Sequence, residues 1–219
     1  MVGRKKSLMS NLKQPESNES LKEFSLLYDE NYYQSGCGIP YERNEHWLNF
    51  FGTIADEIVR SLNPQKVLDA GCAWGFLVES LWDRGVESWG IDISDYAIDK
   101  VRPDMKKYCS VGSLIEPIDT KFDLITCIEV LEHIPENDAR QAVEMLTNVT
   151  ETILFSSTPR DFDEPTHCNV RPIKYWLKLF SDFNFWPEIN YNASFIAPHA
   201  ILLRKSSTPI PDEVLTLFS

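Results

Sequence analysis

Two glutamates and a histidine follow one apolar run of the chain at a spacing that could hold a cation or move a proton. Glu129, Glu132 and His133 stand at positions i, i+3 and i+4. If the chain turns helical after the apolar run, the three side chains point to one side. Two carboxylates and an imidazole gathered in this way are costly unless water or a cation surrounds them.

A second histidine, His167, could complete the same group. It lies in the segment 165–172, which would follow the neighbouring strand of a sheet. Oxygen ligands with one or two imidazoles suit Mg²⁺, Mn²⁺ or Fe²⁺ better than a structural zinc ion. Two other interpretations stay open: His133 or His167 acts as a general base, or the acids and His133 only cap a helix. His46 and His199 have no such partners, and we expect His199 to be structural within an apolar strand.

A ligand-binding turn is indicated by the stretch DAGCAWG, residues 69–75. Small residues there turn the backbone from a strand directly into a helix, so backbone N–H groups can approach a ligand closely. A side chain at Gly71 would prevent this approach. Asp92 comes seventeen residues after Gly75, at the tip of the next strand, where a carboxylate can accept hydrogen bonds from both hydroxyls of a ribose.

The charge of this turn decides between two nucleotide cofactors. A nicotinamide-binding fold would have the pattern G-x-G-x-x-G, but Ala73 stands between Gly71 and Gly75. Asp69 would repel a pyrophosphate, whereas its carboxylate suits a ligand that carries an ammonium group. The sequence therefore favours S-adenosylmethionine (SAM) over a dinucleotide.

The elements that must position these residues alternate between short apolar strands and helices after Pro64. Such alternation predicts an α/β fold: a Rossmann-like, doubly wound and mostly parallel seven-stranded sheet with helices on both faces. The last two strands have no helix between them, which indicates an antiparallel hairpin at the edge. We expect strands at 66–69, 87–92, 108–111, 122–128, 152–156, 187–193 and 199–205, and helices at 45–62, 75–84, 96–101, 136–148 and 172–183.

The remaining segments surround one core domain at 63–207. Residues 1–23 are polar and we expect a disordered arm, and 208–219 form a C-terminal tail. Residues 24–62 form an N-terminal cap or lid and a helix. The stretch 28–47 is rich in aromatic residues and glycine and shows no apolar periodicity, so we expect no regular element in it. Arg43 on this lid could pair with the SAM carboxylate or with an acidic acceptor, or could form a plain surface salt bridge.

Composition limits the partners and the compartment. The formal net charge of −12 argues against binding to phosphate backbones or anionic membranes, so nucleic acid is a disfavoured partner. No apolar run approaches the length of a membrane span. The five cysteines form no CxxC pair, which fits reduced thiols and a cytoplasmic location. The sequence does not indicate an oligomeric state.

From about residue 63 to 205 the chain resembles the class I SAM-dependent methyltransferases. The pattern D-x-G-x-A-x-G at 69–75 matches the first motif of that family, with Ala73 in place of its middle glycine. Asp92 matches the ribose-binding acid, and the segment from Phe122 to Glu129 resembles the fourth-strand motif. The resemblance, together with the charge argument, gives a predicted cofactor site of Arg43, Asp69, Gly71, Cys72, Ala73, Gly75, Asp92, Ile93, Ser113, Leu114 and Glu129.

Within this class, the E-x-x-E-H segment is similar to two groups: the ubiquinone-biosynthesis O-methyltransferases and the small-RNA 2′-O-methyltransferases. In both, the resemblance implies a divalent cation held by Glu129, Glu132 and His133. We expect His167 to be a further ligand of this cation. The segment 37–43 departs from both groups. We therefore expect methyl transfer to the oxygen of a small hydroxylated acceptor, such as a sugar or a natural-product intermediate. A metal-free N- or C-methyltransferase, and a non-catalytic SAM-fold binding subunit, remain as alternatives.

Overall fold

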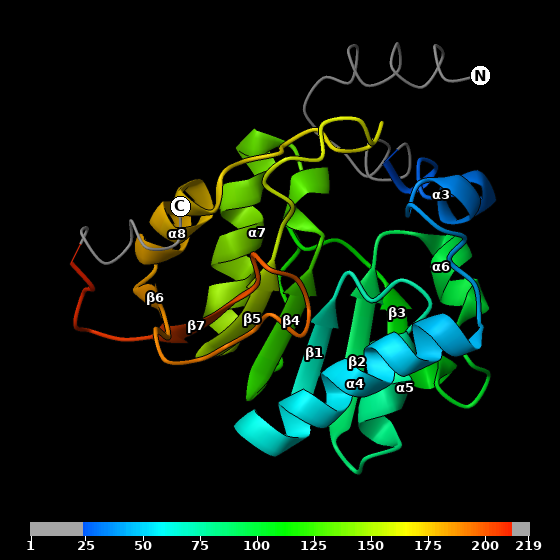
Figure 1. Ribbon diagram of the computed structural model, residues 1–219, viewed down its shortest axis with the longest axis horizontal. Coiled ribbons are helices and arrows are strands. Elements are labelled where there is room, and N and C mark those ends of the chain that lie inside the picture. The colour runs from blue at the N-terminus through cyan, green and yellow to red at the C-terminus, as the bar shows by residue number, and fades with distance from the viewer. Residues whose placement is uncertain (1–23, 212–219) are drawn as a thin grey trace.

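A computed structural model describes residues 24–211 of the protein. The predicted arm at 1–23 and most of the predicted tail at 208–219 lie outside these residues. The described chain builds one seven-stranded sheet in the order β3-β2-β1-β4-β5-β7-β6, with helices on both faces (Figure 1). The strands are β1 (Lys66–Ala70), β2 (Glu87–Asp92), β3 (Cys109–Val111), β4 (Leu124–Ile128), β5 (Thr152–Ser156), β6 (Phe185–Pro187) and β7 (Ile201–Lys205).

The first five strands run parallel, and β7 pairs antiparallel with both β5 and β6. The predicted doubly wound sheet with an antiparallel edge is therefore confirmed. The helices are α3 (Glu30–Ser35), α4 (Glu45–Leu62), α5 (Phe76–Trp82), α6 (Asp95–Lys100), α7 (Glu136–Val149) and α8 (Ile173–Ser181), with two 3₁₀ turns, η1 (Lys106–Tyr108) and η2 (Leu131–His133).

Alternate residues of the central strands build two apolar layers, because successive side chains of a strand point to opposite faces. One layer packs against α4 and α5, and the other packs against α7 and α8 (Figure 1). Val67, Leu124 and Leu154 belong to the first layer, and Leu68, Ile125 and Phe155 belong to the second. The sheet is thus buried on both sides, and its strand ends are left for polar groups. Among residues 24–211, no helix has the length and apolar character needed to cross a membrane.

Two predicted segments differ from the structure. The stretch 28–47 was expected to hold no regular element, but α3 forms within it because Asp29 caps the helix by accepting a hydrogen bond from the Tyr32 N–H at 3.0 Å. The strand predicted at 187–193 ends at Pro187. The chain turns at once, as the Tyr191 N–H donates to the Glu188 carbonyl, and Asn192 then accepts a hydrogen bond from the Ser194 N–H.

Candidate functional site

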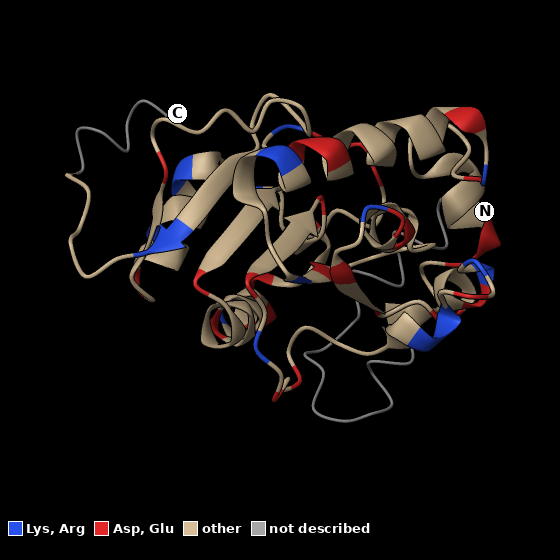
Figure 2. Cartoon of the chain, turned by 90° about the horizontal axis from the view of Figure 1, so that it is seen from below, with Lys and Arg blue, Asp and Glu red and all other residues tan. Residues whose placement is uncertain are grey.

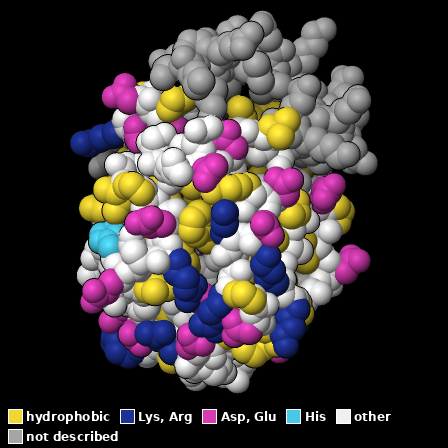
Figure 3. Space-filling view, turned by 90° about the vertical axis from the view of Figure 1, so that its right-hand side faces the viewer, with side chains coloured by type: hydrophobic (Ala, Val, Ile, Leu, Met, Phe, Trp, Pro, Cys, Tyr) yellow, Lys and Arg dark blue, Asp and Glu magenta, His cyan; other side chains and the backbone are white. Residues whose placement is uncertain are grey.

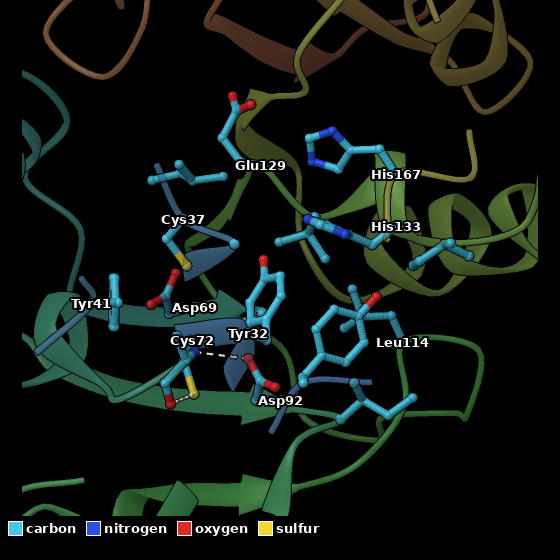
Figure 4. Close-up of a pocket in the computed structure, with 18 of the residues that line it drawn as sticks. Tyr32, Cys37, Tyr41, Asp69, Cys72, Asp92, Leu114, Glu129, His133 and His167 are labelled. Atoms are coloured by element: carbon cyan, nitrogen blue, oxygen red, sulfur yellow. Dashed lines mark hydrogen bonds between the residues drawn. The ribbon is translucent and has the colours of Figure 1, made fainter. Parts of the chain in front are cut away.

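A cavity of about 540 Å³ lies at the carboxyl ends of the parallel strands, beneath the N-terminal cap (residues 24–44). Open α/β sheets bind their ligands at this edge. Figure 4 shows Asp69 and Asp92 on one side of the cavity and Glu129, His133 and His167 on the other. Most of the predicted site residues line it: Asp69, Gly71, Cys72, Ala73, Asp92, Ile93, Ser113, Leu114, Glu129, His133 and His167.

The turn after β1 is held open for a ligand by its backbone. Gly71 has φ +82°, and a Cβ there would collide with the Val130 side chain. Ala73 also adopts a left-handed backbone, with φ 46°, at the position where the related motif has glycine. Asp92 stabilises this arrangement, because its carboxylate accepts hydrogen bonds of 2.8 Å from the N–H groups of Ala73 and Ser94. The turn and the end of β2 therefore form one unit.

Replacing Gly71 with Ala is expected to lower the free energy of unfolding by about 3 kcal/mol, because a left-handed alanine costs about 1–2 kcal/mol and an overpacked side chain about 1–3 kcal/mol. The matched control is Gly85→Ala. Gly85 has a similar φ of +81°, but a Cβ there meets nothing within 4 Å. This control is expected to lose only about 1 kcal/mol. Urea unfolding measures both variants, and equal losses would contradict the predicted clash with Val130.

Asp69 is buried at the end of β1. Its carboxylate accepts a 2.7 Å hydrogen bond from the Thr126 hydroxyl. Burial raises the pKa of Asp69 to about 7, and the nearby Asp92 adds to this rise, although the Thr126 hydrogen bond opposes it. Burial also raises the pKa of Asp92, against the hydrogen bonds that it accepts from the backbone. Asp69 and the partly exposed Asp92, both lining the cavity, form a site that a cationic group would stabilise.

The far end of the cavity is apolar. Leu114 is buried, and Gly112, Ile91 and Ile93 line the wall beside it. A Cβ on Gly112 would lie 2.7 Å from Ile91 Cδ1, so a larger residue would push this wall inward. Such a slot next to Asp92 fits a flat aromatic base whose attached ribose reaches the carboxylate.

The cap covers the cavity through aromatic packing. The Ser94 hydroxyl donates to the Tyr28 carbonyl at 2.7 Å, and the Tyr33 ring stacks on Tyr96 with 5.9 Å between centroids. Tyr28, Tyr32, Tyr33 and Tyr41 all line the cavity. Their large, rigid rings exclude water from the space above the strand ends.

Arg43 and Gly75 belong to the predicted cofactor site but lie outside the cavity. The Arg43 guanidinium forms two 2.8 Å hydrogen bonds to Glu79, a side chain of α5 that is only 4% exposed, and Arg102 approaches the same carboxylate at 3.6 Å. Figure 3 shows basic and acidic side chains interleaved over one face of the molecule. Arg43 thus ties the cap to α5. Gly75 begins α5 with φ 71° and faces Cys109.

Glu129 departs from the predicted one-sided triad. It leaves β4 with φ 52°, a left-handed conformation that is rare for residues other than glycine and is concentrated at functional sites. The helical turn η2 begins only at Leu131. Glu129 therefore lies before this turn and does not share a helical face with His133. Burial raises the pKa of Glu129, but the 2.8 Å hydrogen bond from His199 Nε2, contacts with Ser156 and Glu132 and the charge of His199 together hold that pKa below its usual range. His199, expected within a strand, lies in the turn before β7.

Glu132 is fully buried in η2. One carboxylate oxygen accepts a 3.1 Å hydrogen bond from the Thr158 N–H, and the other has no hydrogen-bond partner among the described residues. Burial, followed by the charge of Glu129, raises the pKa of Glu132 well above its usual range. A buried polar atom without a partner is costly, and such atoms are often found where an ion or water binds.

His133 and His167 lie next to each other near Glu132, with ring centroids 4.6 Å apart. Burial, followed by the neighbouring His167, lowers the pKa of His133 to about 3, so its imidazole is neutral at physiological pH. Candidate ligand atoms of Glu132, His133 and His167 all lie within 4.8 Å of one another. Glu129, which was also predicted as a ligand, is not part of this group.

Sequence reasoning missed the residues that support these side chains. The Thr166 hydroxyl lies 2.9 Å from His133 Nδ1 and donates a 2.5 Å hydrogen bond to Glu164. Its position directly before His167 was the only local signal. The bond between Glu129 and His199 joins residues seventy positions apart, so no local spacing could have indicated it.

Comparison with known proteins shows the family to which this chain belongs. Residues 41–188 match the model of a family described as a methyltransferase domain. A ubiquinone biosynthesis O-methyltransferase of Nitrosomonas europaea is 34% identical over 105 residues, which cover 44% of this chain and 43% of that protein. The matched segment thus spans less than half of this curated relative.

Solved structures show the same fold. The magnesium protoporphyrin IX methyltransferase of Synechocystis PCC 6803 with bound SAH superposes with a TM-score of 0.58 at 15% identity, over 94% of this chain and 95% of that one. The small RNA methyltransferase HEN1 gives a TM-score of 0.55 at 19% identity, over 74% of this chain and 25% of that one.

Proposed function

The chain belongs to the methyltransferase domain family, and from that premise we propose that it transfers the methyl group of SAM to a hydroxyl oxygen of a small acceptor. The observation that carries the proposal is the cavity itself. Asp69 and Asp92 form its cofactor end, and His133 and His167 lie across the cavity from them (Figure 4). A cofactor and an acceptor could therefore meet in one enclosed space.

The residues at the cofactor end fit SAM by charge and shape. Asp69 offers a carboxylate to an ammonium group, Asp92 offers one to the ribose hydroxyls, and Leu114 offers an apolar contact to the base. Gly71 keeps the wall open, because a Cβ there would occupy the place of the Val130 side chain. When bound, SAM supplies an electrophilic methyl group on a sulfonium.

The chain's own residues orient the acceptor and receive its proton. Neutral His133 can accept a hydrogen bond from an acceptor hydroxyl, and His167 stands beside it. Tyr28 and Tyr32 make T-shaped ring contacts with His133, with centroid distances of 5.6 and 6.1 Å, and close the space above it. Positioning of the hydroxyl against the methyl group accounts for much of the expected rate, because methyl transfer needs an in-line approach.

A panel of acceptors incubated with methyl-tritiated SAM tests the proposal. Sugars, catechols, carboxylates and amines should be included, and we expect label in a hydroxylated compound. Transfer to an amine or a carbon alone would favour the N- or C-methyltransferase alternative. SAM binding without transfer to any class would favour a non-catalytic subunit. Figure 2 shows basic and acidic residues dispersed over the helices and loops, which supports a small acceptor over RNA.

We also propose that a divalent cation assists this reaction, held by Glu132, His133 and His167. The proposal is supported by the close approach of their candidate ligand atoms and by the Glu132 oxygen that has no partner among the described residues. Carboxylate and imidazole ligands suit Mg²⁺, Mn²⁺ or Fe²⁺. A cation there would lower the pKa of a hydroxyl that it holds, and His133, as its ligand, would then position that hydroxyl through the cation and would not receive the proton.

Removal of the cation is expected to reduce turnover by at least about 100-fold, because a lost metal ligand or metal ion removes several kcal/mol of stabilisation from the transition state. The measurement is turnover after dialysis against a strong chelator, followed by addition of Mg²⁺, Mn²⁺ or Fe²⁺. Glu132→Gln should resist this rescue, whereas Glu136→Gln, on the exposed start of α7, should respond like the wild type. Full activity in the chelator would contradict the cation and leave the histidines to act alone.

The affinity for SAM is expected to fall at acidic pH through Asp69. Because burial raises its pKa to about 7, the carboxylate is neutralised as the pH drops below that value. An ammonium group binds the ionised form, so affinity should fall by about tenfold for each pH unit below 7. It should also fall above about pH 8, where the amino group of SAM loses its proton.

Other groups near Asp69 do not account for the predicted loss of SAM affinity at acidic pH. Tyr41, Cys72 and Cys127 have pKa values raised well above their usual range by burial and neighbouring groups, so they stay neutral there. Asp92 faces the same space, and its pKa is raised as well. Calorimetric titration of Asp69→Asn separates the two acids. This variant should bind SAM weakly, and its affinity should no longer fall as the pH drops below 7. If the affinity still fell with pH as in the wild type, the titrating group would be Asp92 instead.

A further inference from the structure

We propose that Thr166 and Glu164 are positioning residues that fix the tautomer of His133, with the proton on Nδ1 and a bare lone pair on Nε2. The role of this tautomer in catalysis rests on the proposed function, because His133 lines the same cavity. Its structural basis is separate, because the direction of two hydrogen bonds decides it.

The first bond has only one possible direction. The Thr166 hydroxyl oxygen lies 2.5 Å from Glu164 Oε2, and an ionised carboxylate can only accept. This distance is typical of a hydroxyl that donates to a carboxylate. The Thr166 N–H donates to the same Oε2 at 2.9 Å, which fixes the carboxylate in place. The single hydroxyl proton of Thr166 is therefore committed to Glu164.

The second bond follows from the first. His133 Nδ1 lies 2.9 Å from the same Thr166 oxygen. Since that oxygen has no proton left to donate, it accepts, and His133 Nδ1 must carry the hydrogen. A hydroxyl oxygen has two lone pairs, so accepting from His133 Nδ1 is compatible with donating to Glu164. Thr166 is 2% exposed, so bulk water does not compete for this contact.

The consequence lies at the other ring nitrogen. Among residues 24–211, the only side-chain partner that hydrogen-bonds to the His133 ring is Thr166, at Nδ1, and the His133 side chain lines the cavity. A neutral imidazole with its proton on Nδ1 presents a lone pair at Nε2, which can accept a hydrogen bond from an acceptor hydroxyl or bind a cation. With the opposite tautomer, Nε2 would carry a hydrogen and could do neither.

His167 provides an internal reference. Its Nδ1 lies 2.7 Å from the Asp161 backbone carbonyl, which can only accept, so His167 also carries a proton on Nδ1. This second bond does not involve the Thr166 side chain. His167 Nε2 lies 3.7 Å from the same Glu164 Oε2, so the reference is the Nδ1 proton: a change at Thr166 should alter Nδ1–H at His133 and leave Nδ1–H at His167 in place.

Long-range ¹H–¹⁵N NMR of the ligand-free full chain tests the proposal, because the protonated and bare nitrogens of a neutral imidazole have distinct ¹⁵N shifts. The chain has only 4 histidines, and His133→Asn assigns the signals of His133. We expect Nδ1–H at His133 in the wild type and in Thr166→Ser, which keeps the hydroxyl. In Thr166→Val we expect loss of the Nδ1–H state at His133, with Nδ1–H at His167 in place.

Two results would overturn the proposal: an Nε2–H tautomer at His133 in the wild type, or an unchanged His133 in a folded Thr166→Val. The wild-type measurement stands even if that variant fails to fold. The spectrum needs neither SAM nor an acceptor, so failure of the tautomer and failure of methyl transfer are separate outcomes. If the wild type also binds SAM by calorimetry, Thr166→Val should bind it within about twofold, since Thr166 does not line the cofactor end of the cavity.

Discussion

Asp92→Asn is expected to weaken SAM binding by about 100- to 10,000-fold, the largest effect on affinity that the structure predicts. Two charge-assisted hydrogen bonds to ribose hydroxyls contribute about 1.5–3 kcal/mol each, and about 1.4 kcal/mol corresponds to tenfold in affinity. The carboxylate also holds the N–H groups of Ala73 and Ser94. An amide has one oxygen and cannot serve both of these donors, so the turn after β1 should loosen as well.

Calorimetric titration with SAM measures this loss. The matched control is Asp95→Asn, three residues further along, where the carboxylate is exposed in the first turn of α6 and lies outside the cavity. It should bind SAM like the wild type. If Asp92→Asn also retained wild-type affinity, the cofactor would not bind at the ends of β1 and β2.

His133→Asn is expected to reduce kcat by about 100- to 10,000-fold, the range found when a group that handles the transferred proton is removed. Its affinity for SAM should change by less than about twofold, because Asp69 and Asp92 remain in place across the cavity. The effect would therefore appear in turnover and not in cofactor binding, as for an interaction that is made mainly in the transition state.

The control for this variant is His46→Asn. His46 is exposed near the start of α4 and is absent from the cavity wall. Once an acceptor is identified, kcat and the SAM dissociation constant of both variants can be compared directly. Wild-type turnover in His133→Asn would exclude this imidazole both as the group that receives the proton and as a required cation ligand.

The fold could be predicted largely from periodicity. Both ends of α4 and of β2 were predicted correctly, because a long amphipathic stripe and a short apolar run between turn residues are strong local signals. The predicted strand at 187–193 was wrong because the pairing of β7 with β6 stops after Pro187 and the chain turns. Helix α3 was missed because one capping aspartate and aromatic packing form it, without an apolar stripe.

The site was predictable where neighbours in sequence are neighbours in space. The turn after β1 and the acid after β2 were predicted to lie together, and the structure brings them together because adjacent parallel strands end at the same edge of the sheet. Arg43 forms a salt bridge, which was one of its predicted roles, but its partner, Glu79, lies thirty-six positions away and could not be identified from local spacing. Glu129 was grouped with His133 on the assumption of a continuous helix, whereas its left-handed backbone directs it to His199. Such long-range pairs depend on tertiary packing, which local spacing does not encode.

Calorimetric titration of the wild-type chain with SAM, with SAH as competitor, tests the central claim most directly. The structure predicts saturable binding at one site per chain, lost in Asp92→Asn and retained in Asp95→Asn. SAH should compete, because it has the same ribose, base and amino acid groups. No saturable heat up to about 1 mM SAM, equivalent to a binding free energy weaker than about −4 kcal/mol, would contradict a SAM site in this cavity.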